Sequence, residues 1–427
     1  MLSTLKNAFK VPELKKRILF TLFLIAVYRL GSHIPVPGIN RELLSSAMET
    51  NENTFLSLYN LMTGGAISQF NIFAMGVVPY INASIIMQLL TVAIPYLEQL
   101  SKEGDDGRKK MQNYTRNAAL VLGLIQAYST YLIIRNFNGI SDNSAINVFL
   151  IVITLSTAST FLMWLGDVIT VKGLGNGVSL IIFINILSGI PDTVARIYVS
   201  YTTKSINLVH LIVFVIVAVA MIISVIIMSM AERRISVQYA GKTVGNKTFR
   251  GQSSHIPFNL TATAVIAIIF AMSVMNFPTT IAQFFPNRAW SNFIQNSAYS
   301  PFNAKSVIYP IVYAAAVIFF SWFYAEIYFK PEEMAENIYK SAGFIPGIRP
   351  GKPTAKHISK VLTRVAIIGG IFATVIALVP VIVQNHTSFK NISLGGTSIL
   401  IMVSVAIETV RTLESQLVMR HYHGFLK

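Results

Sequence analysis

The chain has 427 residues, of which 34 are Lys or Arg and 18 are Asp or Glu, so its formal net charge at pH 7 is +16. Charged residues make up only 12% of the sequence, about half of their usual share in soluble domains, whereas 53% of the residues are hydrophobic. So few charges cannot cover the surface of a soluble chain of this length. The absence of Cys excludes disulfides, thiolate metal sites and a cysteine nucleophile. These features indicate a polytopic membrane protein.

Ten apolar segments follow one another along the chain, and most are long enough to cross a hydrocarbon layer, which takes roughly 20 residues. They cover 18–36, 72–96, 118–135, 145–166, 178–191, 206–230, 258–279, 306–329, 361–383 and 394–410. The first and the fifth are short and are bordered by Gly or Pro. We therefore predict an all-α polytopic membrane protein with ten transmembrane helices.

The basic residues predict the orientation of these helices. Lys and Arg collect in short cytoplasmic loops, and here they concentrate in the two terminal segments and in every second loop. The segments on the other side hold few of them, namely Arg41, Arg135, Arg196, Lys204, Arg288, Lys305 and Lys390. We expect both termini to lie in the cytoplasm, and we interpret the first apolar segment as a retained helix because no small-residue cleavage site follows it.

The segment 63–76 departs from the pattern of an apolar helix. It is semi-polar, contains Gly64, Gly65 and Gly76, and runs directly into the second apolar segment. Irregular or half-length backbone at membrane depth is tolerated only when it is buried in protein or lies beside water. The segment is therefore either a re-entrant element that caps a cavity or an ordinary outer loop with a helical turn.

Ionisable residues are rare within the apolar segments, the candidates being Arg29, Asp167, His210, Glu326 and Glu408. A proton- or sodium-coupled carrier should have several facing carboxylates at mid-depth, and these residues lie mostly near segment ends. We expect them to pair locally or to reach the interface. The sequence also lacks a phosphate-binding Gly loop and the Gly-x-Ser-x-Gly and His-Glu-x-x-His motifs, so we expect no catalytic residues, no metal site, no cofactor and no enzyme activity.

Two further features allow two interpretations each. Aliphatic residues at one-turn spacing, such as Val77 and Ile81 or Ile182 and Ile186, share a helix face that either contacts lipid and neighbouring helices or lines a pore. The cytoplasmic loops 231–257 and 330–360 are long and basic, and the Gly and Pro residues of 343–353 predict a defined turn. Such loops suit docking of an acidic protein surface or RNA, or they only enforce topology and touch anionic lipid.

Several motifs along the whole chain resemble the SecY family, the central subunit of the protein-conducting channel of bacterial membranes. They are RLGSHIPVPG at 29–38, FAMGVVPYINASII at 73–86, GDDGRKK at 104–110, GNGVS at 175–179, FIPGIRP at 344–350 and GGTS at 395–398. Six motifs in the same order make the resemblance specific. It implies one channel domain over 1–427, built from inverted five-helix halves at 1–200 and 201–427.

The resemblance also implies a channel closed by a short plug helix and an aliphatic ring. The plug would be Gly64, Gly65, Ala66, Ile67, Ser68, Gln69, Phe70 and Asn71. The ring would be Val77, Ile81, Ile182, Ile186, Ile269 and Ile401, contributed by the second, fifth, seventh and tenth helices. A narrow aliphatic constriction excludes water and ions, yet it does not hold a passing polypeptide by specific hydrogen bonds.

As a SecY-like channel, the chain would pass unfolded secretory polypeptides across the bacterial plasma membrane. It would release signal peptides and hydrophobic nascent segments into membrane lipid through a lateral gate between the second and seventh helices. The expected partners are the SecA motor, the ribosome and the subunits SecE and SecG, with no DNA. The cytoplasmic partner would dock on Arg349, Lys352, Lys247 and Arg250. A secondary carrier of a small solute, or an insertase without a pore, is the alternative function.

Overall fold

We describe a computed structural model of the protein. It describes residues 8–39, 70–136, 140, 144–203, 207–239, 242–244, 247–249, 253–285, 288–303, 306–386 and 395–424. The helices and strands in these ranges are α2 (Pro12–Gly31), α5 (Val78–Ala93), α6 (Pro95–Lys102), α7 (Asp105–Asn136), α8 (Ala145–Lys172), α9 (Gly177–Thr202), α10 (Leu208–Met230), β1 (Glu232–Tyr239), β2 (Lys242–Val244), β3 (Lys247–Phe249), β4 (Ser253–Asn259), α11 (Ala262–Gln283), α12 (Ala289–Asn296), α13 (Tyr309–Phe329), α14 (Pro331–Lys340), β5 (Gly343–Phe344), α15 (Lys352–His386) and α16 (Gly396–Gly424).

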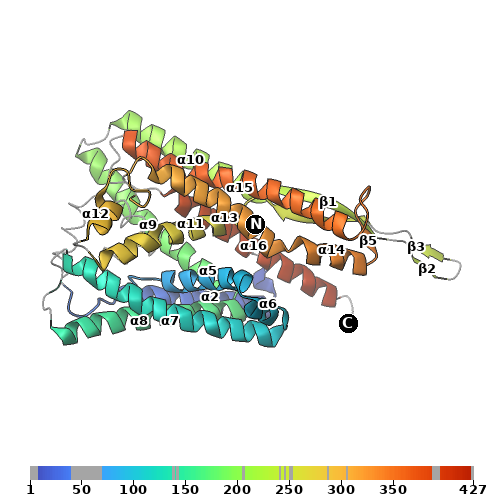
Figure 1. Cartoon of the computed structure of the whole chain (residues 1–427), viewed down its shortest axis with the longest axis horizontal. Coiled ribbons are helices and arrows are strands. Elements are labelled where there is room, and N and C mark those ends of the chain that lie inside the picture. The colour runs from blue at the N-terminus through green and yellow to red at the C-terminus, as the bar shows by residue number, and fades with distance from the viewer. Residues whose placement is uncertain are drawn as a thin grey trace.

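The helices form an elongated bundle, with β1, β5 and the β2–β3 hairpin at one end and α12 at the other (Figure 1). Each of the ten predicted apolar segments falls on a helix, which confirms the helical membrane-protein fold. Within the described residues, eight helices are long and apolar enough to cross a membrane. The pair α5 and α6, bent by 102° at Pro95, would add a ninth.

Helix α2 would be the tenth crossing helix, but its first turns carry Glu13, Lys15, Lys16 and Arg17. These charges leave it a shorter apolar stretch than the other helices have. The count of ten crossing helices therefore stays a prediction.

Local sequence signals explain where the helices near the bundle centre begin. The Asn176 side chain accepts hydrogen bonds from the backbone N–H groups of Val178 and Ser179 and so caps α9. Gly175, just before the cap, has a φ of +70°, which a residue with a side chain rarely adopts. At Gly177 a Cβ atom would lie 2.1 Å from the Gly166 carbonyl oxygen of α8. The GNGVS motif thus lets α9 start against α8.

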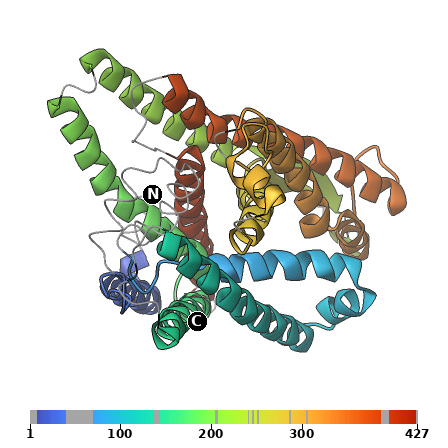
Figure 2. The ribbon, with the colours of Figure 1, turned by 60° about the vertical axis from the view of Figure 1, so that its left-hand side comes forward.

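Two groups of helices pack around separate apolar cores. One core joins α11, α13, α15 and α16, and it includes the completely buried Val317, Ala267 and Leu400. The other joins α2, α8, α9 and α16 around Leu162, Ile169 and Ile181. Figure 2 shows α5 and α7 on one side of the molecule and α13 and α15 on the other. Helix α16 packs against both α9 and α10 and so contributes to both cores.

The two predicted cytoplasmic loops fold into one unit that contains a small sheet. Strand β1 pairs antiparallel with β4, Ile235 lying opposite Ile256, and on its other edge with β5, Gln238 lying opposite Phe344. Inward-facing side chains of the sheet pack on α14 and on the first turns of α15. The sequence analysis predicted no strands in these loops, and the sheet forms because alternating residues of β1 bury Ile235 and Val237 on one face.

Candidate functional site: an aliphatic ring, a seam and a basic face

The structure brings all six predicted ring residues into one apolar cluster. Val77 caps α5 and Ile81 lies on its first turn, Ile182 and Ile186 lie on successive turns of α9, Ile269 is on α11 and Ile401 on α16. The exposed fractions are 1% for Ile401, 3% for Val77, 5% for Ile182 and 6% for Ile186. Ile81 and Ile269 are partly buried and also pack against the α11–α13 core. Four helices therefore meet through branched aliphatic side chains.

Of the predicted plug, Gly64, Gly65, Ala66, Ile67, Ser68 and Gln69 lie outside the described residues. The structure describes Phe70 and Asn71, and both are 2% exposed. They sit in a short antiparallel bridge with the segment after α2, because the Ile72 N–H donates to the Ile34 carbonyl and the Val36 N–H to the Phe70 carbonyl. Phe70 packs among Ala127, Tyr131 and Leu155, in a core that does not contain the ring residues. These two residues are thus fixed to the wall of the bundle.

The predicted lateral gate corresponds to the contact between α5 and α11. On α5, Ile85 is buried in the α11–α13 core, one turn beyond Ile81. Beside this contact, α7 approaches the C-terminal end of α11. The Ser129 hydroxyl donates to Gln283 Oε1 at 2.5 Å, and the rings of Tyr128 and Phe284 stack with centroids 5.8 Å apart. We call these four residues the seam clasp, since they join the segment 1–200 to the segment 201–427.

The basic docking residues lie on the unit formed by the β1–β4–β5 sheet, α14 and α15. Arg349 and Lys352 are exposed, and Arg349 is in a turn between Gly347 and Gly351, whose φ angles are +80° and +93°. The Thr354 hydroxyl donates to the Arg349 carbonyl at 2.9 Å, and the neighbouring Ile345 is buried in the core of the unit. The predicted defined turn is therefore present. Lys247 lies in β3, and Arg250 lies outside the described residues.

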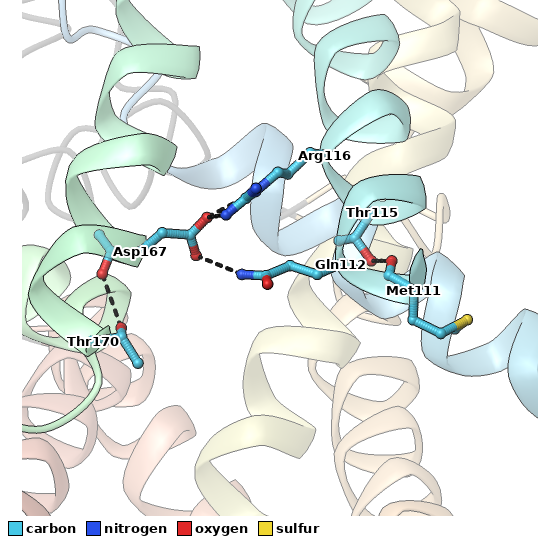
Figure 3. A network of polar contacts seen from close by, with 7 residues as sticks. Met111, Gln112, Thr115, Arg116, Asp167 and Thr170 are labelled. Carbon is cyan, nitrogen blue, oxygen red and sulfur yellow. Dashed lines mark hydrogen bonds and ion pairs between the residues drawn. The ribbon is translucent and has the colours of Figure 1, made fainter. Parts of the chain in front are cut away.

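The in-span ion pair expected from the sequence is found at Asp167. Arg116 of α7 binds Asp167 of α8 through Nη2 at 2.6 Å and Nε at 3.0 Å, and Gln112 Nε2 donates to the other carboxylate oxygen at 3.3 Å (Figure 3). Glu326 likewise accepts a hydrogen bond from Ser359 at 3.0 Å. Both carboxylates are satisfied by neighbouring helices. Within the described residues, no group of three His, Cys, Asp or Glu side chains could hold a metal ion.

Sequence analysis missed three polar links between distant segments. These are the hydrogen bond from the Tyr28 hydroxyl of α2 to Asn185 of α9, the seam clasp, and the contact between Arg411 of α16 and Glu232 of β1 at 3.3 Å. Each joins residues more than 150 positions apart in the sequence. No local spacing rule could have paired them.

Comparisons with known proteins agree with this architecture. The family model described as SecY matches residues 71–410. The chain is 41% identical to the protein translocase subunit SecY of Halalkalibacterium halodurans over the full length of both chains, and 40% identical to that of Bacillus subtilis, again over both full lengths. It is 39% identical to that of Thermotoga maritima, covering 100% of this chain and 98% of the other.

Solved structures with the same fold include one described as a protein conducting channel. It has a TM-score of 0.65 and 16% identity, and the match covers 93% of this chain and 91% of that one. Another is Sec61 in the canine ribosome-channel complex, with a TM-score of 0.61, 15% identity and the same coverage. The comparisons do not support a carrier of small solutes. Full-length identity near 40% and the shared fold place this multi-pass membrane protein in the SecY family of protein-conducting channel subunits.

Proposed function

We propose that polypeptides cross this SecY-family channel through the aliphatic ring. The packing of six branched side chains from four helices in one cluster, four of them buried and two partly buried, carries this proposal. A constriction lined only by such groups dewets when it is narrow, so it blocks ions without a charged gate. It also offers no fixed donors or acceptors to a threading chain. The ring therefore accepts polypeptides of any sequence that are unfolded enough to enter it.

The plug closes the outer side of the ring, and we assign it to 64–69, with Phe70 and Asn71 as its anchor. The buried bridge of these two residues to the segment after α2 supports this division, since it fixes one end of the plug while leaving the ring core separate. Displacement of the plug then needs no change in the bridge between Pro35 and Asn71.

Hydrophobic signal peptides and membrane segments leave sideways between α5 and α11. Transfer from water to lipid drives this step, and the bundle supplies no energy and catalyses no reaction. The mixed character of the contact supports the proposal, because Ile81 and Ile85 join the halves by apolar packing alone and the seam clasp adds a hydrogen bond at one end. The apolar contacts between α5 and α11 can be replaced readily by contacts with a passing hydrophobic segment.

The basic unit docks the partner that supplies energy, either the SecA motor or the ribosome. Exposed Arg349 and Lys352, held on a turn fixed by the buried Ile345 and Thr354, support this assignment. A guanidinium held in this way can bind a carboxylate or phosphate in bidentate fashion. The unit faces the cytoplasm, as do both termini, the membrane is the bacterial plasma membrane, and SecE and SecG complete the complex.

Crosslinking of a polypeptide stalled in transit tests the path. Because the chain contains no Cys, single Cys residues at Ile81, Ile182 and Ile401 give unambiguous crosslinks. A matched control is Val219 on α10, which is 49% exposed and belongs to neither of the two apolar cores. We expect the stalled chain to crosslink at the three ring positions and not at Val219. Crosslinks at none of the ring positions would contradict the proposed path.

A further inference from the structure

Glu408 lies on the same face of α16 as the ring residue Ile401. The two residues are seven positions apart, so Glu408 is about 10 Å further along the helix axis and within about 20° of the same direction. Glu408 belongs to the part of α16 that is long and apolar enough to cross a membrane, Gly396–Val418. Ile401 is 1% exposed, whereas Glu408 is exposed. The tight packing of the ring therefore ends before Glu408.

Two neighbouring residues of α16 define the direction in which Glu408 points. Thr409 faces the start of α9, since a Cβ atom at Gly175 would lie 3.8 Å from the Thr409 hydroxyl oxygen. Arg411 faces β1, where its Nη2 donates to Glu232 at 3.3 Å. At about 100° per residue, the direction of Glu408 lies between these two. Glu408 thus points, like Ile401, into the interior of the channel.

Polar side chains of α5 and α9 lie on the same side of the ring as Glu408. Gln88 follows Ile81 by seven residues on α5, is exposed, and donates through Nε2 to the Ser84 hydroxyl at 3.4 Å. Ser179 precedes Ile182 by three residues on α9, whose start faces Thr409. The interior beyond the ring is therefore lined with polar groups, and Glu408 adds a negative charge to them.

Glu408 has no counterion among the residues that the structure describes. Asp167, another carboxylate within a predicted span, binds Arg116 at 2.6 Å, but no Lys, Arg or His side chain of the described ranges forms an ion pair with Glu408. A charged residue at membrane depth is costly and usually marks the path of a charged substrate. The cation that pairs with Glu408 therefore comes from a molecule that enters the channel.

A secretory signal peptide has the matching chemistry. It carries a positively charged n-region, followed by an apolar segment of about 7–15 residues. A helix of about ten apolar residues centred on the ring reaches about 7 Å towards Glu408, so the n-region begins near the level of the carboxylate. The cytoplasmic loops are basic in a chain of net charge +16, and they repel such an n-region. A carboxylate inside the channel offsets this repulsion.

We propose that Glu408 binds a Lys or Arg side chain of the signal-peptide n-region. The inference rests on the proposed function, which places the apolar segment between α5 and α11. The bound cation stays on the cytoplasmic side of the ring while the following polypeptide passes through it, so Glu408 helps to fix the orientation of the signal peptide. Gln88 and Ser179 keep hydrogen-bonding groups near the cation.

Disulfide formation measures where the n-region lies. Thr412 is one turn beyond Glu408 on the same face, and Thr412→Cys is specific because the sequence has no other Cys. A precursor stalled in the purified complex carries one Cys in its n-region, next to either two Lys or two Gln. An exposed ion pair changes an equilibrium by up to about fivefold. We therefore expect the Lys precursor to give about three- to fivefold more disulfide than the Gln precursor.

Matched channel variants assign this preference to Glu408. Glu408→Gln should lower the Lys-to-Gln ratio to about one, whereas Glu408→Asp should keep it. Glu408→Lys should lower the disulfide yield of the Lys precursor, and a precursor with two Glu in the n-region should restore it. The control Glu414→Gln removes the same charge from a direction about 120° away on α16 and should leave the ratio unchanged.

Crosslinking at Ile81→Cys in a separate variant shows whether the precursor has reached the ring. A Lys-to-Gln ratio of one in the parent, with crosslinks at Ile81 intact, would overturn the role of Glu408 and leave the proposed path standing. Missing crosslinks at the ring would contradict the path itself. An equal loss of disulfide for both precursors in Glu408→Gln would indicate a structural or motor-binding role and would also overturn the inference.

Discussion

Replacement of Ile401 by Asn tests whether the aliphatic ring seals the closed channel. Ile401 lies on α16, is 1% exposed and packs in the same cluster as the other five ring residues. The change removes about 2 kcal/mol of apolar burial. It also places an amide without a hydrogen-bond partner in the cluster, which costs about 2 kcal/mol more. Water entering the ring would relieve both losses, so the ratio of dry to hydrated ring should fall about a thousandfold.

Ion conductance of the purified complex in planar bilayers measures this change. We expect the Asn variant to conduct in the absence of a translocating polypeptide. The matched variant Ile401→Val, which keeps an apolar side chain and costs about 1 kcal/mol, should stay as tight as the parent. If the folded Asn variant remained as tight as the Val variant, the ring would not be the seal.

Three further predictions concern residues outside the ring. Ser129→Ala leaves Gln283 without its buried hydrogen-bond partner, which costs about 1–3 kcal/mol and should favour opening of the seam. In export assays this variant should pass signal peptides that are less hydrophobic than the parent accepts. Ser129→Thr, which keeps the hydroxyl, should require the same signal-peptide hydrophobicity as the parent. Arg349→Glu should block motor-driven export without lowering membrane insertion of the protein, and export at the parent rate by this variant would refute the docking role. Asp167→Asn breaks the ion pair with Arg116, whose side chain is 40% exposed. A thermal unfolding assay should show a free energy of unfolding lower by about 1–2 kcal/mol. The ion conductance of the closed channel should remain at the parent level, because the ring is unchanged.

The helices extend beyond the apolar segments that predict them. Helix α7 begins at Asp105, although the apolar segment begins at 118, and α15 begins at Lys352, although the apolar segment begins at 361. Hydropathy detects only the part of a helix that lies in hydrocarbon, because backbone hydrogen bonding continues the helix into water without apolar side chains.

The cytoplasmic segments show a second limit of local inference. Their length, charge and Gly–Pro spacing predicted a defined turn near Arg349, and Gly347 and Gly351 do adopt left-handed backbone there. Their pairing into one sheet was not predicted, since β5 has only two residues and joins a strand about a hundred positions earlier. A strand this short has no periodicity of its own and is defined by its partner.

The sequence by itself determined that the protein lies in a membrane, which segments are helical and that some helices carry an aliphatic stripe. These features depend on composition and on spacing within one segment. Whether the stripe faces lipid or the centre of the bundle depends on which helices surround it, and only the tertiary structure decided that. Ile182 and Ile186 have the same local pattern as the exposed aliphatic residues of α10, yet they are buried because α5, α11 and α16 close around them. Apolar side chains are stable in lipid and in protein alike, so hydrophobicity alone cannot assign them to either.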